Sequence, residues 1–153
     1  MSASDLRIDR KSNKIHIVGF LGQENFRVLL ASIHAAIHVS GYSDIELNFG
    51  ECSAAFPAAM LPLCAVCLRE QKAGVKFSYV PPAIEKLRKL FLDANWAYLI
   101  DPSQTETLFR GYLQVPATLF HDFREQHIAV ERVVVAILKS VTGFSRKDFE
   151  AFE

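Results

Sequence analysis

The chain has 153 residues, of which half are hydrophobic, and its 17 basic residues balance 17 acidic ones to a formal net charge of zero. This length suits one compact domain with a real core, and the lack of a basic excess argues against a nucleic-acid partner. No apolar run approaches the roughly 18 residues of a membrane span, and residues 1–5 lack the apolar core of a signal peptide, so we expect a cytoplasmic protein with no membrane insertion. The odd number of cysteines, three, agrees with a reducing compartment.

The N-terminal part of the chain predicts a hairpin followed by a helix. Residues 6–9 and 14–19 carry strand-type residues on either side of the polar turn 11–13, which is typical of two antiparallel strands. Apolar residues recur at helical spacing from about residue 23 to 39, and Gly41 ends that pattern.

The middle of the chain predicts two strands that alternate with two helices. Residues 45–49 alternate apolar and polar side chains, as a half-buried strand requires, and an almost wholly apolar helix follows around residues 61–68. Residues 75–80 form the second strand, and Pro81 and Pro82 stop it and open the second helix. Strands joined by a helix of this length are most simply parallel.

A last strand and a turn complete the first predicted domain. Residues 95–100 are interpreted as the strand, and residues 101–104 have the composition of a turn at a domain end. We therefore place the first domain at residues 1–103.

Residues 104–153 are predicted to form a linker and a helical extension. Residues 113–120 favour an edge strand, and Asp122 is placed to cap a long helix. Gly143 would end this helix, and residues 145–148 look like the start of another.

The order of elements resembles the STAS domain of anti-sigma-factor antagonists. Residues 56–60 stand where that family has an Asp-Ser-Ser-Gly-Leu-like sequence at a helix start, and residues 72–75 and 81–87 also follow the family's pattern. The resemblance covers roughly residues 5–101 and implies an α/β fold, with helices packed on a mixed, mostly parallel sheet. It also implies a role in bacterial signalling through protein contact, without catalysis.

One position departs from the family. In antagonist-type members a partner kinase phosphorylates the second Ser of the helix start, but this chain has Ala58 there. An alanine has no hydroxyl to accept phosphate, and the nearby Ser53 does not match the acceptor position. The resemblance therefore implies that the phosphorylation switch is lost.

The same helix start is the predicted partner-binding surface. STAS-like modules meet partners there, and small residues flanked by Phe and Met would allow close apolar contact. Ordinary packing at a helix start is the alternative, because Pro57 suits a first helical position. The predicted partner-binding residues are Phe56, Pro57, Ala58, Ala59, Met60 and Pro62.

Residues 113–153 resemble the lead-in to a histidine-kinase-like ATPase domain, without that family's Asn-containing box and Gly-rich lid. The resemblance implies a chain truncated before an ATPase; a self-contained tail helix that packs on the domain is the alternative. An apolar stripe on this helix is expected to pair with a second copy and form a homodimer. The predicted dimer residues are Val130, Val133, Val134, Ile137 and Leu138.

Two pairs of residues suggest metal or redox chemistry and have simpler interpretations. Cys64 and Cys67 lie inside an apolar helix and not at its start, which favours buried core cysteines. His34 and His38 stand four residues apart, but no Glu follows His34 as in the zinc hydrolase signature. This favours isolated histidines on a helix face.

Three polar residues remain as candidates near predicted strand ends. Asp93, Asn95 and Asp101 could face a ligand, as in other α/β folds, and turn formation explains them equally well. No phosphate-binding loop, nucleophile elbow or nucleophile-base pair is evident, so we predict no enzyme activity, no metal and no cofactor.

The function expected from the sequence is that of a regulatory STAS-like module that binds a histidine-kinase-like ATPase in the same polypeptide or in a partner. A structural adaptor subunit of a lipid-transport ATPase and a small-ligand sensor are the alternatives.

Overall fold

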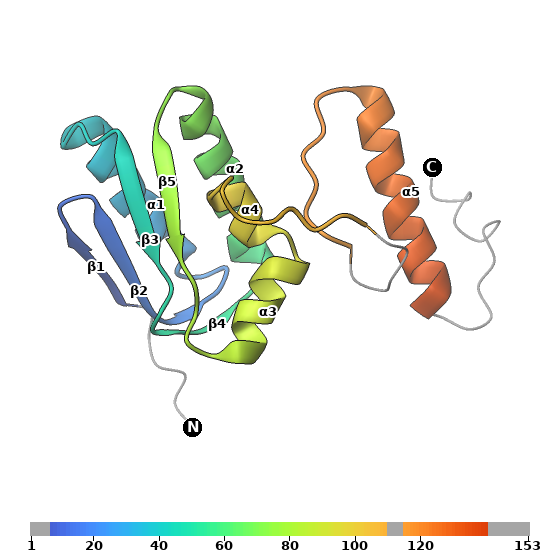
Figure 1. Cartoon of the computed structure of the whole chain (residues 1–153), viewed down its shortest axis with the longest axis horizontal. Helices are drawn as coiled ribbons and strands as arrows, with labels where there is room; N and C mark the ends of the chain where they lie inside the picture. Colours follow the sequence, from blue (N-terminus) through green and yellow to red (C-terminus); the bar gives the residue numbers. More distant parts are fainter. Residues whose placement is uncertain (1–6, 110–114, 141–153) are drawn as a thin grey trace.

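The computed structural model describes residues 7–109 and 115–140, and its α/β core is built on a five-stranded sheet (Figure 1). Strands β1 (Arg7–Lys11) and β2 (Lys14–Leu21) form the predicted antiparallel hairpin. Ser12 sits in the turn in the left-handed region, at φ 57°. The hairpin interpretation is confirmed for these residues, and Leu6 lies outside the described part of the chain.

The other strand pairs are parallel, as predicted for the middle of the chain. Strand β3 (Asp44–Asn48) pairs with the first half of β2, and β4 (Cys52–Ala55) pairs with its second half. Strand β5 (Lys76–Val80) pairs with β3 along its whole length. The sheet is therefore mixed and mostly parallel, in the order β1-β2-β3-β5, with β4 continuing the line of β3 along β2.

Two helices of the α/β core, α1 (Phe26–His34) and α2 (Pro57–Lys72), cover one face of the sheet. Buried and less buried residues alternate along β2, β3 and β5, which is the pattern of a sheet with one covered face. Figure 1 shows α1 and α2 together behind the strands. The helices are α1 (Phe26–His34), the π-helical turn η1 (Ala35–Val39), α2 (Pro57–Lys72), α3 (Glu85–Asp93), α4 (Trp96–Ile100) and α5 (Phe123–Ser140).

An aromatic cluster joins α3 and α4 to the sheet. The ring of Phe91 lies 4.9 Å from Phe49, 5.8 Å from Tyr79 and 5.4 Å from Trp96, measured between ring centroids. Such ring pairs stabilise by about 0.5–1.5 kcal/mol each beyond the burial of their area. The cluster fixes α3 beside the carboxyl ends of β3 and β5.

The predicted last strand is a helix. Residues 96–100 form α4, and Asn95 precedes it in the left-handed conformation at φ 66°. Asn enters this region more easily than most residues, so it can make the sharp turn that separates α3 from α4. The apolar residues of α4 are buried through helical packing, and they pair with no strand.

The C-terminal extension is in part as predicted. The backbone N–H of Glu125 donates to Asp122 Oδ1 at 2.8 Å, which confirms the predicted cap of α5. Residues 115–120 form no strand, so the predicted edge strand is wrong there. The predicted helix end at Gly143 and the helix start at 145–148 lie outside the described residues.

No helix in the described ranges is both long enough and apolar enough to cross a membrane.

Candidate protein-interaction surface

The start of α2 is held firmly by the sheet. Phe56 has extended backbone angles, and its N–H donates to the carbonyl of Leu21 at the end of β2, at 3.1 Å. Pro57 then takes the first helical position, where its missing N–H costs no hydrogen bond. The Phe56 ring packs against Phe20 with centroids 5.0 Å apart, yet 45% of the residue remains exposed.

The predicted partner-binding residues divide between the surface and the core. Phe56, Pro57 and Ala58 are exposed, and Pro62 is half-buried. Ala59 and Met60 have no exposed surface, so their assignment to a contact surface needs correction. Residues 60, 63, 64 and 67 recur at helical spacing and all point into the core, and Ala59 lies beside that face.

The exposed face of the first two turns of α2 includes one residue outside the predicted set. Leu61 is 50% exposed and follows Pro57 and Ala58 at helical spacing. The exposed apolar group of Phe56, Pro57, Ala58 and Leu61 is called here the α2 start surface.

A groove lies beside this surface, between β4 and α3. Its volume is about 640 Å³, and Ser53, Ala54 and Ala55 of β4 form one wall. The α3 wall carries both apolar and charged side chains. These are Ile84, Lys86, Leu87, Lys89, Leu90 and Asp93.

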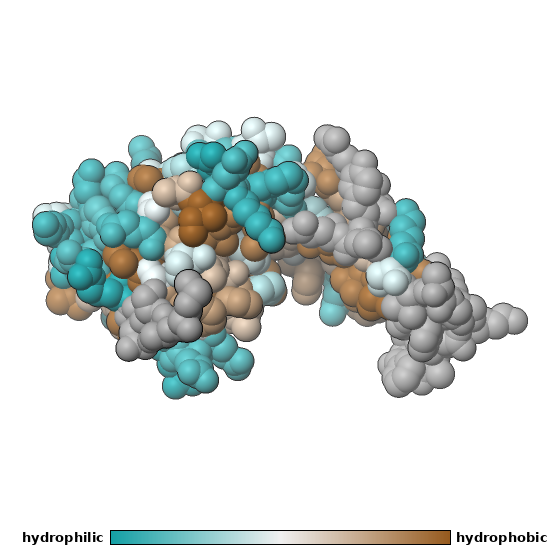
Figure 2. Space-filling view, turned by 90° about the horizontal axis from the view of Figure 1, so that it is seen from below, coloured by the Kyte–Doolittle hydropathy of each residue, from teal (hydrophilic) through white to brown (hydrophobic). Residues whose placement is uncertain are grey.

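A second, mostly apolar cavity of about 560 Å³ continues from the same place toward the C-terminal segment. Phe56, Leu61 and Trp96 line its core side, and residues 115–118 and α5 line the other. Figure 2, seen from below, shows the molecule narrowing between the α/β core and α5. The two cavities share Ala55, Phe56 and Leu90, so the groove and the cavity adjoin.

Asn95 ties the C-terminal segment to the core. Its Nδ2 donates to the carbonyl of Ala117 at 3.0 Å, and its Oδ1 accepts from the N–H of Thr107 at 3.0 Å. The N–H of Ala117 also donates to the carbonyl of Ala94 at 2.9 Å. These contacts cross the domain end predicted at residue 103.

The other two polar candidates have local roles. The Asp101 carboxylate accepts from the N–H of Tyr79 at 3.3 Å and of Ser103 at 3.0 Å, which fits turn formation. Asp93 pairs with Lys89 at 2.6 Å along α3. The three candidates therefore do not form one site.

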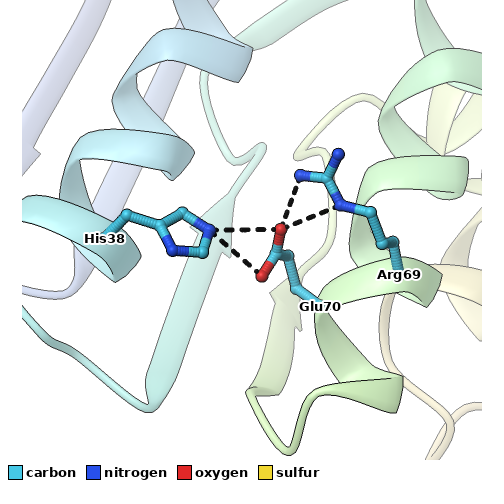
Figure 3. A network of polar contacts seen from close by, with 3 residues as sticks. All are labelled: His38, Arg69 and Glu70. Carbon is cyan, nitrogen blue, oxygen red and sulfur yellow. Dashed lines mark hydrogen bonds and ion pairs between the residues drawn. The ribbon is translucent and has the colours of Figure 1, made fainter.

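His38 lies near the buried carboxylate of Glu70 (Figure 3). Its Nε2 is 3.3 Å from that carboxylate, which Arg69 also contacts at 2.6 Å, and its ring centroid is 4.8 Å from that of His34. No group of three metal-ligating side chains occurs among the residues whose placement is described. The network joins the end of η1 to the end of α2.

The cysteines are buried core residues, as predicted for Cys64 and Cys67. Burial raises the pKa of Cys52 to about 11 and of Cys64 to about 12, and it also raises that of Cys67. These side chains are therefore neutral thiols at neutral pH and poor nucleophiles.

The predicted dimer residues form a stripe on α5. Val130, Val133 and Ile137 are 42%, 46% and 36% exposed. Val134 and Leu138 are half-buried.

Comparisons with models of protein families, with curated proteins and with solved structures gave no match for this chain. The STAS resemblance therefore rests on sequence pattern and element order.

Proposed function

We propose that this chain is a non-catalytic, STAS-like regulatory module that binds a partner protein through the α2 start surface. The partner is a histidine-kinase-like ATPase domain, in the same polypeptide or in a second protein. The observation that carries the proposal is the exposure of Phe56 and Leu61, at 45% and 50%, on one rigid helix start.

The energetics favour protein contact at this surface. Full burial of a Phe or Leu side chain is worth about 1.5–3 kcal/mol, and contacts of this size dominate many interfaces. Pro57 and Ala58 lie between Phe56 and Leu61 in the sequence, and their small side chains allow a partner backbone to approach. Because α2 is anchored by the core, little ordering entropy is lost when a partner binds.

The test is a calorimetric titration of the chain with each member of a panel of purified anti-sigma-type ATPase domains. We expect at least one member of the panel to bind. Leu61→Asp and Ala58→Glu should each weaken that binding by about tenfold or more, because burial of a charge without a counter-ion costs free energy. Val28→Asp is the matched control, since Val28 is 56% exposed on a different helix, α1, and lines neither cavity.

Two results would contradict the proposal: no member of the panel binds, or the α2 variants bind as the parent does. Circular dichroism of each variant separates lost binding from lost folding. Met60→Asp is unsuitable here, because Met60 is fully buried and the variant should unfold.

A further inference from the structure

Among the described residues, the outer edge of β4 has no strand beside it, like the outer edges of β1 and β5 at the two ends of the sheet. Strands β3 and β4 lie one after the other along β2, but β5 pairs with β3 alone. Pro81 and Pro82 follow Val80, and Pro cannot donate to a ladder, so β5 cannot continue beside β4. After a last bond from the N–H of Ala83 to the carbonyl of Gly50, at 3.2 Å, the chain turns into α3.

The outer edge of β4 keeps backbone groups that can pair with another strand. Along a parallel strand the N–H and C=O groups point alternately to its two edges, so half of those on β4 face away from β2. In the described part of the chain, β4 has β2 as its one ladder partner. An edge of this kind is a template for strand addition.

The space beside this edge is large enough for an extended segment. The groove between β4 and α3 has a volume of about 640 Å³, within the usual range for ligand sites. Of the residues that line the groove on β4, Ser53 is exposed, Ala54 is half-buried and Ala55 is buried, and all three have small side chains. Strand β4 and α3 lie at the same end of the molecule (Figure 1). A new strand would lie about 4.8 Å from β4, where β5 would lie if it were longer.

The walls of the groove define the side chains that an incoming segment needs. Leu87 and Leu90 supply apolar surface, and Ile84 is 48% exposed at one end. Among the charged residues, Lys89 is paired with Asp93, and Lys86 makes no ion pair with any residue whose placement is described. The groove therefore has a spare positive charge at its rim.

We propose that the β4–α3 groove binds an extended segment of another protein, which adds a strand to the outer edge of β4. The segment has apolar, strand-forming residues that face α3 and an acidic residue that meets Lys86. Main-chain hydrogen bonds supply affinity and the α3 wall supplies selectivity, as in other cases of strand addition. This site adjoins the α2 start surface, with which it shares Phe56, and the inference does not depend on an ATPase partner.

The experiment selects binders from a displayed library of random heptapeptides on the full chain. We expect enrichment of peptides that combine β-branched residues with Asp or Glu. Each enriched peptide is then synthesised in a second form with alternate backbone amides N-methylated. N-methylation leaves the side chains in place but removes hydrogen-bond donors, so fluorescence anisotropy should show about tenfold weaker binding or none.

Protein variants locate the peptide. Ile84→Ser should weaken binding about threefold or more through lost apolar contact, while Leu92→Ser, a change at an exposed Leu of the same helix outside the groove, should not. Lys86→Glu should abolish the preference for acidic peptides. Leu61→Asp should leave peptide binding unchanged, because Leu61 does not line the groove, and this result distinguishes the inference from the proposed function.

Three results would overturn the inference. The library yields no binder; N-methylated peptides bind as well as their parents; or Ile84→Ser and Leu92→Ser affect binding equally.

Discussion

Glu70 is a buried carboxylate that stays charged because two side chains contact it. Its exposed fraction is 4%, and Nε and an Nη atom of Arg69 donate to Oε1 at 3.0 and 2.6 Å. The Arg69 hydrogen bonds lower the pKa of the Glu70 carboxyl below its usual 4.5, burial has the opposite and smaller effect, and the His38 contact lowers the pKa further. The charged form therefore holds η1 and α2 together (Figure 3).

We predict that Glu70→Gln destabilises the fold by about 1–2 kcal/mol at pH 7, since Arg69 is largely exposed and solvent screens its share. A lowered folded pKa means that the parent's extra stability is present above pH 4.5 and is lost as the pH falls through the lower, folded pKa. Urea unfolding of both proteins at pH 7 and pH 3 measures this. The difference should shrink at pH 3.

Glu24→Gln is the control, because Glu24 is exposed and its replacement should change neither curve. A Glu70→Gln protein as stable as the parent at pH 7, or a difference that grows toward pH 3, would contradict this reading of the network.

At the scale of elements, strands with strong alternation could be predicted and short apolar segments could not. In β3, Ile45 and Leu47 alternate with polar residues, so its period is unambiguous. The four residues of β4 include no β-branched side chain, and the strand forms because β2 offers a free half beside it. The sequence pattern therefore predicts neither β4 nor its outer edge, although Pro81 and Pro82 limit the length of β5.

The α4 segment shows the limit of periodicity. Five apolar residues fit a strand or a helix equally well, and tertiary packing, including that of Trp96 against Phe91, decides for the helix. The α2 start lies in the element that the sequence predicts, and the helical phase of that element also separates inward from outward residues. Counting back from Cys64 and Cys67 puts Met60 on the inward face.

The junction between α3 and α4 yields a second prediction, at Asn95. Asn95→Gly keeps easy access to φ 66° but loses the hydrogen bonds to Thr107 and Ala117, and Asn95→Ala loses both advantages. We expect both variants to be destabilised, and the Ala variant to be less stable than the Gly variant by about 1 kcal/mol, because of the left-handed conformation.

Thermal unfolding of the two variants and the parent measures this order. Asn13→Gly and Asn13→Ala, in the β-hairpin turn, form the control pair, since Asn13 has no positive φ. An Ala variant as stable as the Gly variant would show that the conformation of Asn95 carries no energetic weight.

At the scale of the whole molecule, α5 stands apart from the sheet and exposes apolar residues (Figure 1). Val130, Val133 and Ile137 follow one another at intervals of three and four, with Phe123, 82% exposed, seven residues before Val130. This is the spacing of a coiled-coil seam. A second copy of the same helix would cover the stripe in a two-fold contact.

We predict that the chain is a dimer through α5 and that Val133→Glu with Ile137→Glu makes it monomeric, because two carboxylates would face each other in an apolar seam. Light scattering should give twice 17.2 kDa for the parent and 17.2 kDa for the double variant. Val28→Glu with Val39→Glu is the matched control, since Val28 on α1 and Val39 at the end of η1 are exposed, at 56% and 78%. A chain shortened to end at His121 keeps the Asn95 contacts with Thr107 and Ala117, so it should stay folded and be monomeric.

Two results would show that α5 is not the contact between copies. One is a parent chain that is monomeric at about 100 μM, where a helix seam of this size should associate. The other is a dimer that survives the double substitution.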